Sequence, residues 1–107
     1  MSWILKIEEK YTLYTPSFSD VSSFEASLLS FKAEVNKVID CSSIVLTHTA
    51  IDLLAKAYDL HASSSISFVV VISDDDDMDT LEEHFIVVPT ISEAIEYIYM
   101  EELEKNL

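Results

Sequence analysis

The chain has 107 residues, the size of one small domain, and half of them are apolar. Its 20 acidic residues against 6 basic ones give a net charge of -14. A surface this negative repels a phosphate backbone, which argues against nucleic acids and anionic membranes as ligands. We therefore expect a single domain over residues 1–107 whose partners are proteins.

Two residue types are informative because they are scarce. Cys41 is the single cysteine, so no internal disulfide can form. No apolar run approaches the roughly 20 residues needed to span a bilayer, and the first residues do not resemble a secretion signal. Glycine is absent, which excludes the P-loop, the dinucleotide fingerprint and the nucleophile elbow. We expect a protein of the bacterial cytoplasm that has no cofactor.

The first elements follow from apolar periodicity. Residues 3–9 and 10–15 alternate between apolar and more polar side chains, which predicts two short strands, the second ended by Pro16. From residue 21 to residue 35, apolar side chains recur at three- and four-residue steps. This spacing predicts a helix with one buried face.

Capping residues and a second amphipathic pattern define the middle of the chain. Ser22 and Glu25 have the spacing of a capping box at the start of the first helix. Residues 38–41 form a short apolar strand. A second amphipathic helix follows, entered through Thr47 or Thr49 as its N-cap and ended by a run of serines.

The last third contains the clearest strand. Residues 66–72 are almost continuously apolar, as expected for a central strand covered on both faces. An aspartate run and at most one weak helical turn precede a short strand over residues 85–88. Thr90 and Glu93 form a second capping box at the start of a C-terminal helix. This order of elements predicts one mixed sheet whose parallel strands are covered by helices.

Two segments resemble those of a known family. They are Val38-Ile39-Asp40-Cys41-Ser42-Ser43-Ile44 with the following residues to Leu54, and Leu81 to Ala94, which contains Glu-His-Phe and Ser-Glu-Ala. Both are similar to the STAS domain, which is shared by anti-anti-sigma factors of the SpoIIAA type and by anion-transporter tails. The resemblance covers roughly residues 35–100. It implies an α/β fold with a SpoIIAA-like (STAS) mixed sheet of four to five strands, flanked by about three helices.

The resemblance also implies a function. In the family, a partner kinase that is also an anti-sigma factor phosphorylates a serine at the start of a helix, and the added charge breaks the docked complex. In this chain that position is Ala50, the glycine after it is Ile51, and His48 stands where an aspartate is usual. We therefore expect a non-catalytic module, similar to an anti-sigma factor antagonist, whose usual phosphoserine site is lost. Its partner would be an anti-sigma factor, a kinase-like protein or another regulator, and the chain itself a monomer or a weak homodimer.

The expected docking surface lies around the end of the 38–41 strand and the start of the second helix. Asp40 is equally well interpreted as a cap or turn aspartate, whereas a purely N-capping role is the favoured interpretation of Thr47 or Thr49. Thr49 is also the candidate phosphorylation site, because a helix N-terminus stabilises a dianion. The candidate partner-binding residues are Asp40, Ser42, Thr47, His48, Thr49 and Asp52.

The remaining chemistry-bearing residues point to no catalytic or metal centre. The carboxylates Asp74, Asp75, Asp76, Asp77 and Asp79 are weak candidates for a Ca²⁺ site, because they lack the alternating ligands and the glycine of a calcium loop. An alternative function, a small-ligand or cation-binding domain on the same fold, depends on this run or on the docking surface. The histidines are His48, His61 and His84. They lack metal-ligand spacing and are expected at helix ends or on the surface. Cys41 is expected to be inert core packing.

Overall fold

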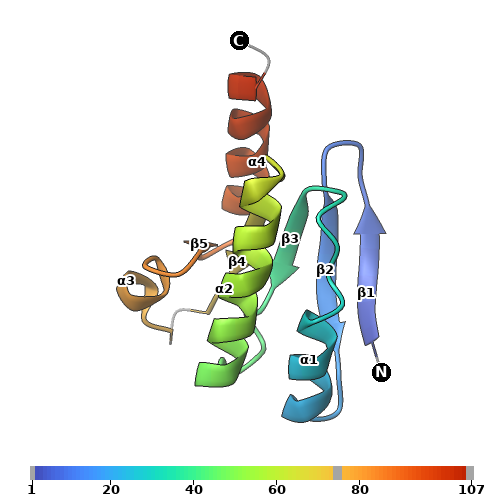
Figure 1. Cartoon of the computed structure of the whole chain (residues 1–107), viewed down its shortest axis with the longest axis vertical. Coiled ribbons are helices and arrows are strands. Elements are labelled where there is room, and N and C mark those ends of the chain that lie inside the picture. The colour runs from blue at the N-terminus through green and yellow to red at the C-terminus, as the bar shows by residue number, and fades with distance from the viewer. Residues whose placement is uncertain (1, 74–75, 106–107) are drawn as a thin grey trace.

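The computed structural model describes residues 2–73 and 76–105. Within them, five strands form one mixed sheet in the order β1-β2-β3-β4-β5 (Figure 1). β1 and β2 pair antiparallel, and the other neighbours pair parallel. The α/β class and the predicted order of elements are confirmed. The elements are β1 (Ser2–Ile7), β2 (Thr12–Ser17), α1 (Val21–Leu28), β3 (Lys37–Asp40), α2 (His48–Ser63), β4 (Phe68–Val71), α3 (Met78–Leu81), β5 (Ile86–Val88) and α4 (Ile91–Lys105).

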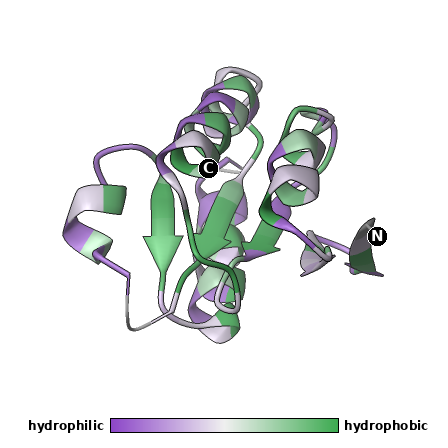
Figure 2. Ribbon diagram, turned by 90° about the horizontal axis from the view of Figure 1, so that it is seen from below, coloured by the Kyte–Doolittle hydropathy of each residue, from purple (hydrophilic) through white to green (hydrophobic). Residues whose placement is uncertain are grey.

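Helices cover both faces of the sheet. α1 and α2 lie on one face, where Phe24 and Leu54 pack against Ile39 of β3. α4 lies on the other face, where Ile98 packs against Val38. Figure 2 shows the predominantly apolar strands between these two layers. None of the helices within the described ranges combines the length and the apolar composition needed to cross a membrane.

The first helix is shorter than its periodicity predicts. α1 ends at Leu28 instead of continuing to residue 35. The Ser27 hydroxyl donates to the Phe24 carbonyl over 2.5 Å, and the Ser30 hydroxyl donates to the Ser27 carbonyl over 2.7 Å. Serine hydroxyls that bond nearby carbonyls compete with helical bonds, so helix extension is disfavoured here. Phe31 still packs on the core from the irregular segment beyond the helix, which explains the misleading period.

The capping box predicted at Ser22 and Glu25 is also wrong. The N-cap of α1 is Asp20, whose carboxylate accepts a hydrogen bond from the Ser23 amide over 2.7 Å. That bond holds the pKa of Asp20 below its usual value. Glu25 turns away from its own helix and accepts a hydrogen bond from Thr47 instead. At α2 and α4 the predicted caps are confirmed, since Thr47 caps α2 and the Thr90 hydroxyl accepts from the Glu93 amide.

Pro16 lies within β2 and does not end it. The pairing of β2 with β3 stops at Tyr14. No parallel-ladder hydrogen bond to β3 is therefore lost because Pro16 has no backbone N–H. A proline is tolerated in a strand where its missing donor has no partner to lose. On its other side Pro16 lies opposite Trp3 of β1.

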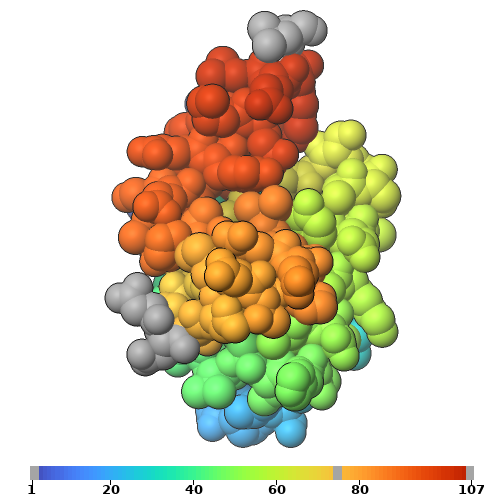
Figure 3. Space-filling view, turned by 90° about the vertical axis from the view of Figure 1, so that its left-hand side faces the viewer, coloured from blue at the N-terminus to red at the C-terminus, as the bar shows by residue number. Residues whose placement is uncertain are grey.

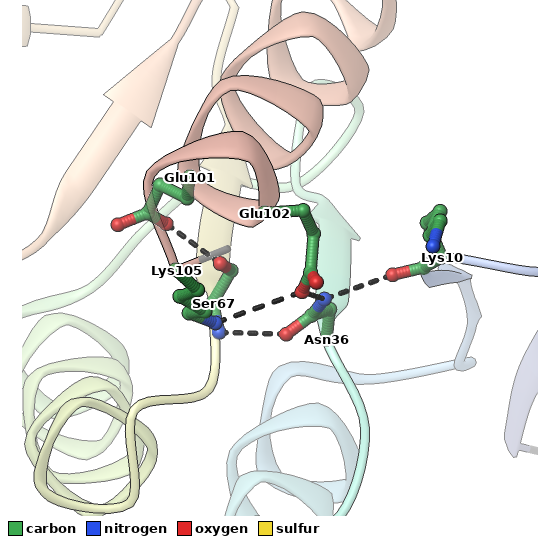
Figure 4. Close-up of polar contacts among 6 residues, drawn as sticks. All are labelled: Lys10, Asn36, Ser67, Glu101, Glu102 and Lys105. Atoms are coloured by element: carbon green, nitrogen blue, oxygen red, sulfur yellow. Dashed lines mark hydrogen bonds and ion pairs between the residues drawn. The ribbon is translucent and has the colours of Figure 1, made fainter. Parts of the chain in front are cut away.

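Asn36 joins its own segment to three others at the amino end of the parallel strands (Figure 4). Its side-chain amide donates to the Lys10 carbonyl over 2.9 Å and to the Glu102 carboxylate over 2.7 Å. Its side-chain oxygen accepts from the Ser67 amide over 2.9 Å. The Ser67 hydroxyl in turn donates to Glu101 over 2.6 Å. The side chain at a predicted turn therefore links the β1–β2 hairpin, the start of β4 and the end of α4.

Candidate functional site at the carboxyl end of the sheet

The candidate site lies where the parallel strands end. Asp40 and Val71 are the last residues of β3 and β4 and pair with each other, so the segments that follow them begin side by side. Partners and ligands of open α/β sheets gather at this end of the strands. In Figure 3 the β3–α2 loop and the start of α2, in green, lie directly against α3, in orange.

Asp40 forms a turn with Ser42. One carboxylate oxygen of Asp40 accepts from the Ser42 amide over 3.1 Å and from the Ser42 hydroxyl over 2.6 Å. This is the Asx-turn arrangement, in which an aspartate replaces a backbone turn. Asp40 is half-buried, and through these two bonds its carboxylate shapes the β3–α2 loop. Ser42 is exposed at the surface of that loop.

Thr47 also has a structural role. Its hydroxyl oxygen accepts from the Ala50 amide over 3.1 Å, which caps α2, and its proton is donated to Glu25 of α1. The choice between Thr47 and Thr49 as the cap is thereby decided for Thr47. One threonine hydroxyl therefore starts α2 and also ties it to α1.

Replacing Thr47 with alanine should lower the free energy of unfolding by about 1–2 kcal/mol, because the N-cap and the donor to Glu25 are both lost. Urea unfolding followed by circular dichroism measures this difference. Thr47→Ser keeps the hydroxyl and is the matched control, with a loss well below that of alanine. Equal losses in the two variants would show that the methyl group, and not the hydroxyl, stabilises this helix start.

The other predicted docking residues are open to solvent. His48, Thr49 and Asp52 are exposed on the first turns of α2, whereas Ala50 between them is fully buried. A residue at position 50 therefore faces the core and could not be reached by a kinase without unfolding the start of the helix. Thr49, the candidate phosphorylation site, carries the exposed hydroxyl at this helix start.

Val45 is a feature of the site that the sequence reasoning missed. Its side chain is 81% exposed in the middle of the β3–α2 loop, which makes it the most exposed of the large apolar residues. A hollow of about 230 Å³ lies beside this loop, between α2 and α3. It is lined by Leu46, Ile51, Asp76, Asp77, Thr80 and Leu81. No periodic pattern signals Val45, because a loop valine is exposed or buried according to the path of the loop.

Two carboxylates of the aspartate run, Asp76 and Asp77, are engaged in local structure. Asp74 and Asp75 lie outside the described residues. Asp76 accepts hydrogen bonds from the amide and the hydroxyl of Ser73, over 3.0 and 3.1 Å. Asp77 caps α3, and its bond from the Thr80 hydroxyl holds its pKa below the usual value. Asp79 is exposed, and no group of three or more potential ligands able to hold a metal occurs among residues 2–73 and 76–105.

Cys41 has no accessible thiol. It is completely buried, and burial raises its pKa far above the ordinary range of a thiol. A thiolate is the reactive form of cysteine, so this side chain is inert packing, as expected.

A buried polar pair lies away from the candidate site. His61 lies in the last turn of α2, at a helix end as predicted, but it is fully buried, whereas His48 and His84 are exposed. Its Nε2 lies 2.8 Å from the Lys37 ammonium, and its Nδ1 donates to the Ala57 carbonyl over 2.6 Å. His61 continues the three- and four-residue spacing of the buried residues Ala50, Leu54 and Ala57. This spacing was the signal in the sequence that could have predicted its burial.

Comparison with known proteins identifies the fold and no family. No family model matches the chain, and no curated protein matches it. A solved structure described as the NMR structure of the protein TM1081 is similar, with a TM-score of 0.61 and 15% sequence identity. The alignment covers 89% of this chain and 86% of that one. At this identity the likeness concerns the fold alone.

Proposed function

We propose that the chain is a non-catalytic, STAS-like regulatory module of the bacterial cytoplasm that docks on another protein. The docking surface consists of the β3–α2 loop and the first turns of α2. The observation that carries the proposal is Val45, an apolar side chain 81% exposed in a short stretch of sequence that also exposes the polar residues Ser42, His48 and Thr49. An apolar centre with a polar rim is the usual anatomy of a protein interface.

The hollow that Leu46 of the β3–α2 loop lines supports the same interpretation. Leu46 and Ile51 provide its apolar lining, and Asp76 and Asp77 provide its acidic lining. A partner side chain with an apolar stem and a positive end, such as arginine or lysine, fits this chemistry. The net charge of -14 favours a basic or mixed partner surface for the same electrostatic reason. An anti-sigma factor or a kinase-like regulator with such a surface is the partner that we propose.

Regulation would differ from that of the family which the sequence resembles. Ala50 has no hydroxyl and lies in the core, so docking does not depend on phosphorylation at that position. Thr49 is the candidate replacement. A phosphate there would be stabilised by the free amides at the start of α2, and it would place about two negative charges on the docking surface.

A capture experiment with matched valine variants tests the proposal. The tagged chain is immobilised, proteins retained from the cytoplasm of its own bacterium are identified by mass spectrometry, and Val45→Arg is compared with Val35→Arg. Val35 is also exposed, at 45%, but precedes β3 at the opposite end of the strands. We expect Val45→Arg to retain less than about a tenth of the wild-type amount, since losing a central anchor costs roughly 2 kcal/mol or more.

Two results would contradict the docking surface. One is a retained partner that both arginine variants bind equally well, and the other is a wild-type chain that retains no protein reproducibly. Thr49→Glu, in the same assay, shows whether charge at the start of α2 releases the partner.

A further inference from the structure

The sheet has one unprotected edge. Among residues 2–73 and 76–105, β1 pairs with β2 only, and Figure 1 shows no helix or strand beyond it. The opposite edge strand, β5, is three residues long and is contacted by α3, whereas β1 has six residues. An edge strand presents a row of unpaired backbone amides and carbonyls, and most proteins shorten, cover or charge it.

β1 also exposes apolar side chains on both of its faces. Ile4 is 62% exposed, Leu5 49% and Ile7 77%. The register places Leu5 opposite Tyr14, on the sheet face that carries α1 and α2, and Ile4 on the other face. The strand contains no proline, and its single charged side chain is Lys6. These are the features of a strand that pairs with another strand.

We propose that two copies of the chain associate through their β1 strands, paired antiparallel and centred on Leu5. This proposal goes beyond the docking function, because it uses a different surface and a different partner.

Charge leaves this edge as the place where a second copy can dock. None of the 20 acidic residues lies in Ser2–Ile7, whereas the chain as a whole has a net charge of -14. Two copies repel each other over most of their surface, so the acid-free edge is where they can come into contact. A second copy also brings a free strand of the same length and with the same exposed apolar side chains.

The pairing register follows from the side chains. Centred on Leu5, the two strands place Leu5 opposite Leu5, Trp3 opposite Ile7 and Ile4 opposite Lys6, so that every directly opposed pair shares one face. A register centred on Lys6 would oppose two ammonium groups. A register centred on Ile4 would leave Ile7, which is more exposed than Ile4 and Leu5, outside the pair.

Crosslinking tests the register directly. Cys41 is fully buried, so a cysteine introduced on the surface is the reactive thiol of the chain. Directly opposed residues of antiparallel strands have Cα atoms about 4.5–5.5 Å apart, which a disulfide can bridge. We expect Leu5→Cys to form a covalent dimer under mild oxidation in high yield, and Leu103→Cys, at a residue 64% exposed on α4, to remain at least tenfold less crosslinked.

Reversible association is measured by light scattering over a range of concentrations. Leu5→Lys opposes two lysines and should weaken dimerisation at least tenfold, while the charge-matched Leu103→Lys should leave it within threefold of the wild type. Leu5 is half exposed, so the lysine is compatible with folding, and far-UV circular dichroism checks this. Added salt should strengthen the dimer, because it screens the repulsion between the acidic copies.

The possible outcomes separate cleanly. A chain that stays monomeric at millimolar concentration overturns the proposal, as does a dimer that survives Leu5→Lys or crosslinks equally well through position 103. Partner capture by the docking surface is measured separately, so failure of one proposal leaves the other standing.

Discussion

Replacing Asn36 with alanine should lower the free energy of unfolding by about 3 kcal/mol, a large part of the stability of a domain of this size. The side chain makes three hydrogen bonds, to the Lys10 carbonyl, the Glu102 carboxylate and the Ser67 amide. Ser67 is only 4% exposed, so its amide would be left without an acceptor in a place that water hardly reaches. The bond to Glu102 is charge-assisted and therefore stronger than a neutral one.

Two control variants separate the contributions of Asn36. Glu102→Gln keeps an acceptor for the Asn36 amide and loses only the charge, so it should cost less than about 1 kcal/mol. Asn36→Asp keeps the acceptor for Ser67 but places a second carboxylate next to Glu102, and it should destabilise at neutral pH more than Glu102→Gln does. Urea unfolding at pH 7 measures all three variants. A loss below 1 kcal/mol for Asn36→Ala would mean that water replaces these bonds without cost.

Periodicity in the sequence predicts the order of elements and the central strand because these depend on neighbours along the chain. The four residues of β4 are all buried, as a continuously apolar run predicts, and Thr47 caps its helix through an amide three residues away. The end of α1 was missed for a related reason. Phe31 keeps the helical spacing although its backbone has left the helix, and spacing alone cannot distinguish the two cases.

Features that depend on distant residues could not be predicted. Asn36 looks like a turn residue, but its partners Ser67 and Glu102 are 31 and 66 residues away. The candidate site shows the same division. Its predicted residues are neighbours in the sequence and therefore lie together. Which of them are available to a partner depends on a more distant residue, because Glu25 of α1 accepts the hydrogen bond of the Thr47 hydroxyl.

Lys37 alone should raise the free energy of unfolding by about 2 kcal/mol between pH 7 and 9.5. This side chain is 2% exposed, and burial lowers its pKa from 10.5 to about 8, against the smaller opposing effect of Glu34. At Lys37 the unfolded chain therefore binds more protons than the folded chain between pH 8 and 10.5, so this residue stabilises the native state as pH rises through the window. Cys41 acts in the opposite direction from about pH 8.5, because its buried thiol stays protonated while the thiol of the unfolded chain ionises, so the rise of the whole chain is smaller. Above pH 10 the raised pKa values of Tyr14 and Tyr97 add to this opposing effect, which sets the upper limit of the measurement.

The three acceptors around Lys37 explain why a buried ammonium is tolerated at neutral pH. Its Nζ donates to the Lys32 and Val35 carbonyls over 2.5 and 3.3 Å, and to Nε2 of His61 over 2.8 Å. Because Nδ1 of His61 donates to a carbonyl, Nε2 carries the lone pair that faces the ammonium. Burial, together with the Lys37 charge, lowers the pKa of His61. Stability should therefore also fall as the pH drops below about 6.5, where the unfolded histidine takes up its proton first.

Lys37→Met tests this account, because methionine fills a similar volume and cannot titrate. Chemical unfolding of the variant should show no rise in free energy between pH 7 and 9.5 and a decline above about pH 8.5 because of Cys41, so that the free energy of the wild type relative to the variant increases by about 2 kcal/mol. Lys32→Met is the matched control, since Lys32 is exposed and contributes only its backbone carbonyl to the pair. The rise should persist in that control. If Lys37→Met kept the full rise, another group would have to be responsible, and Lys37 would have to titrate near its ordinary value in spite of its burial.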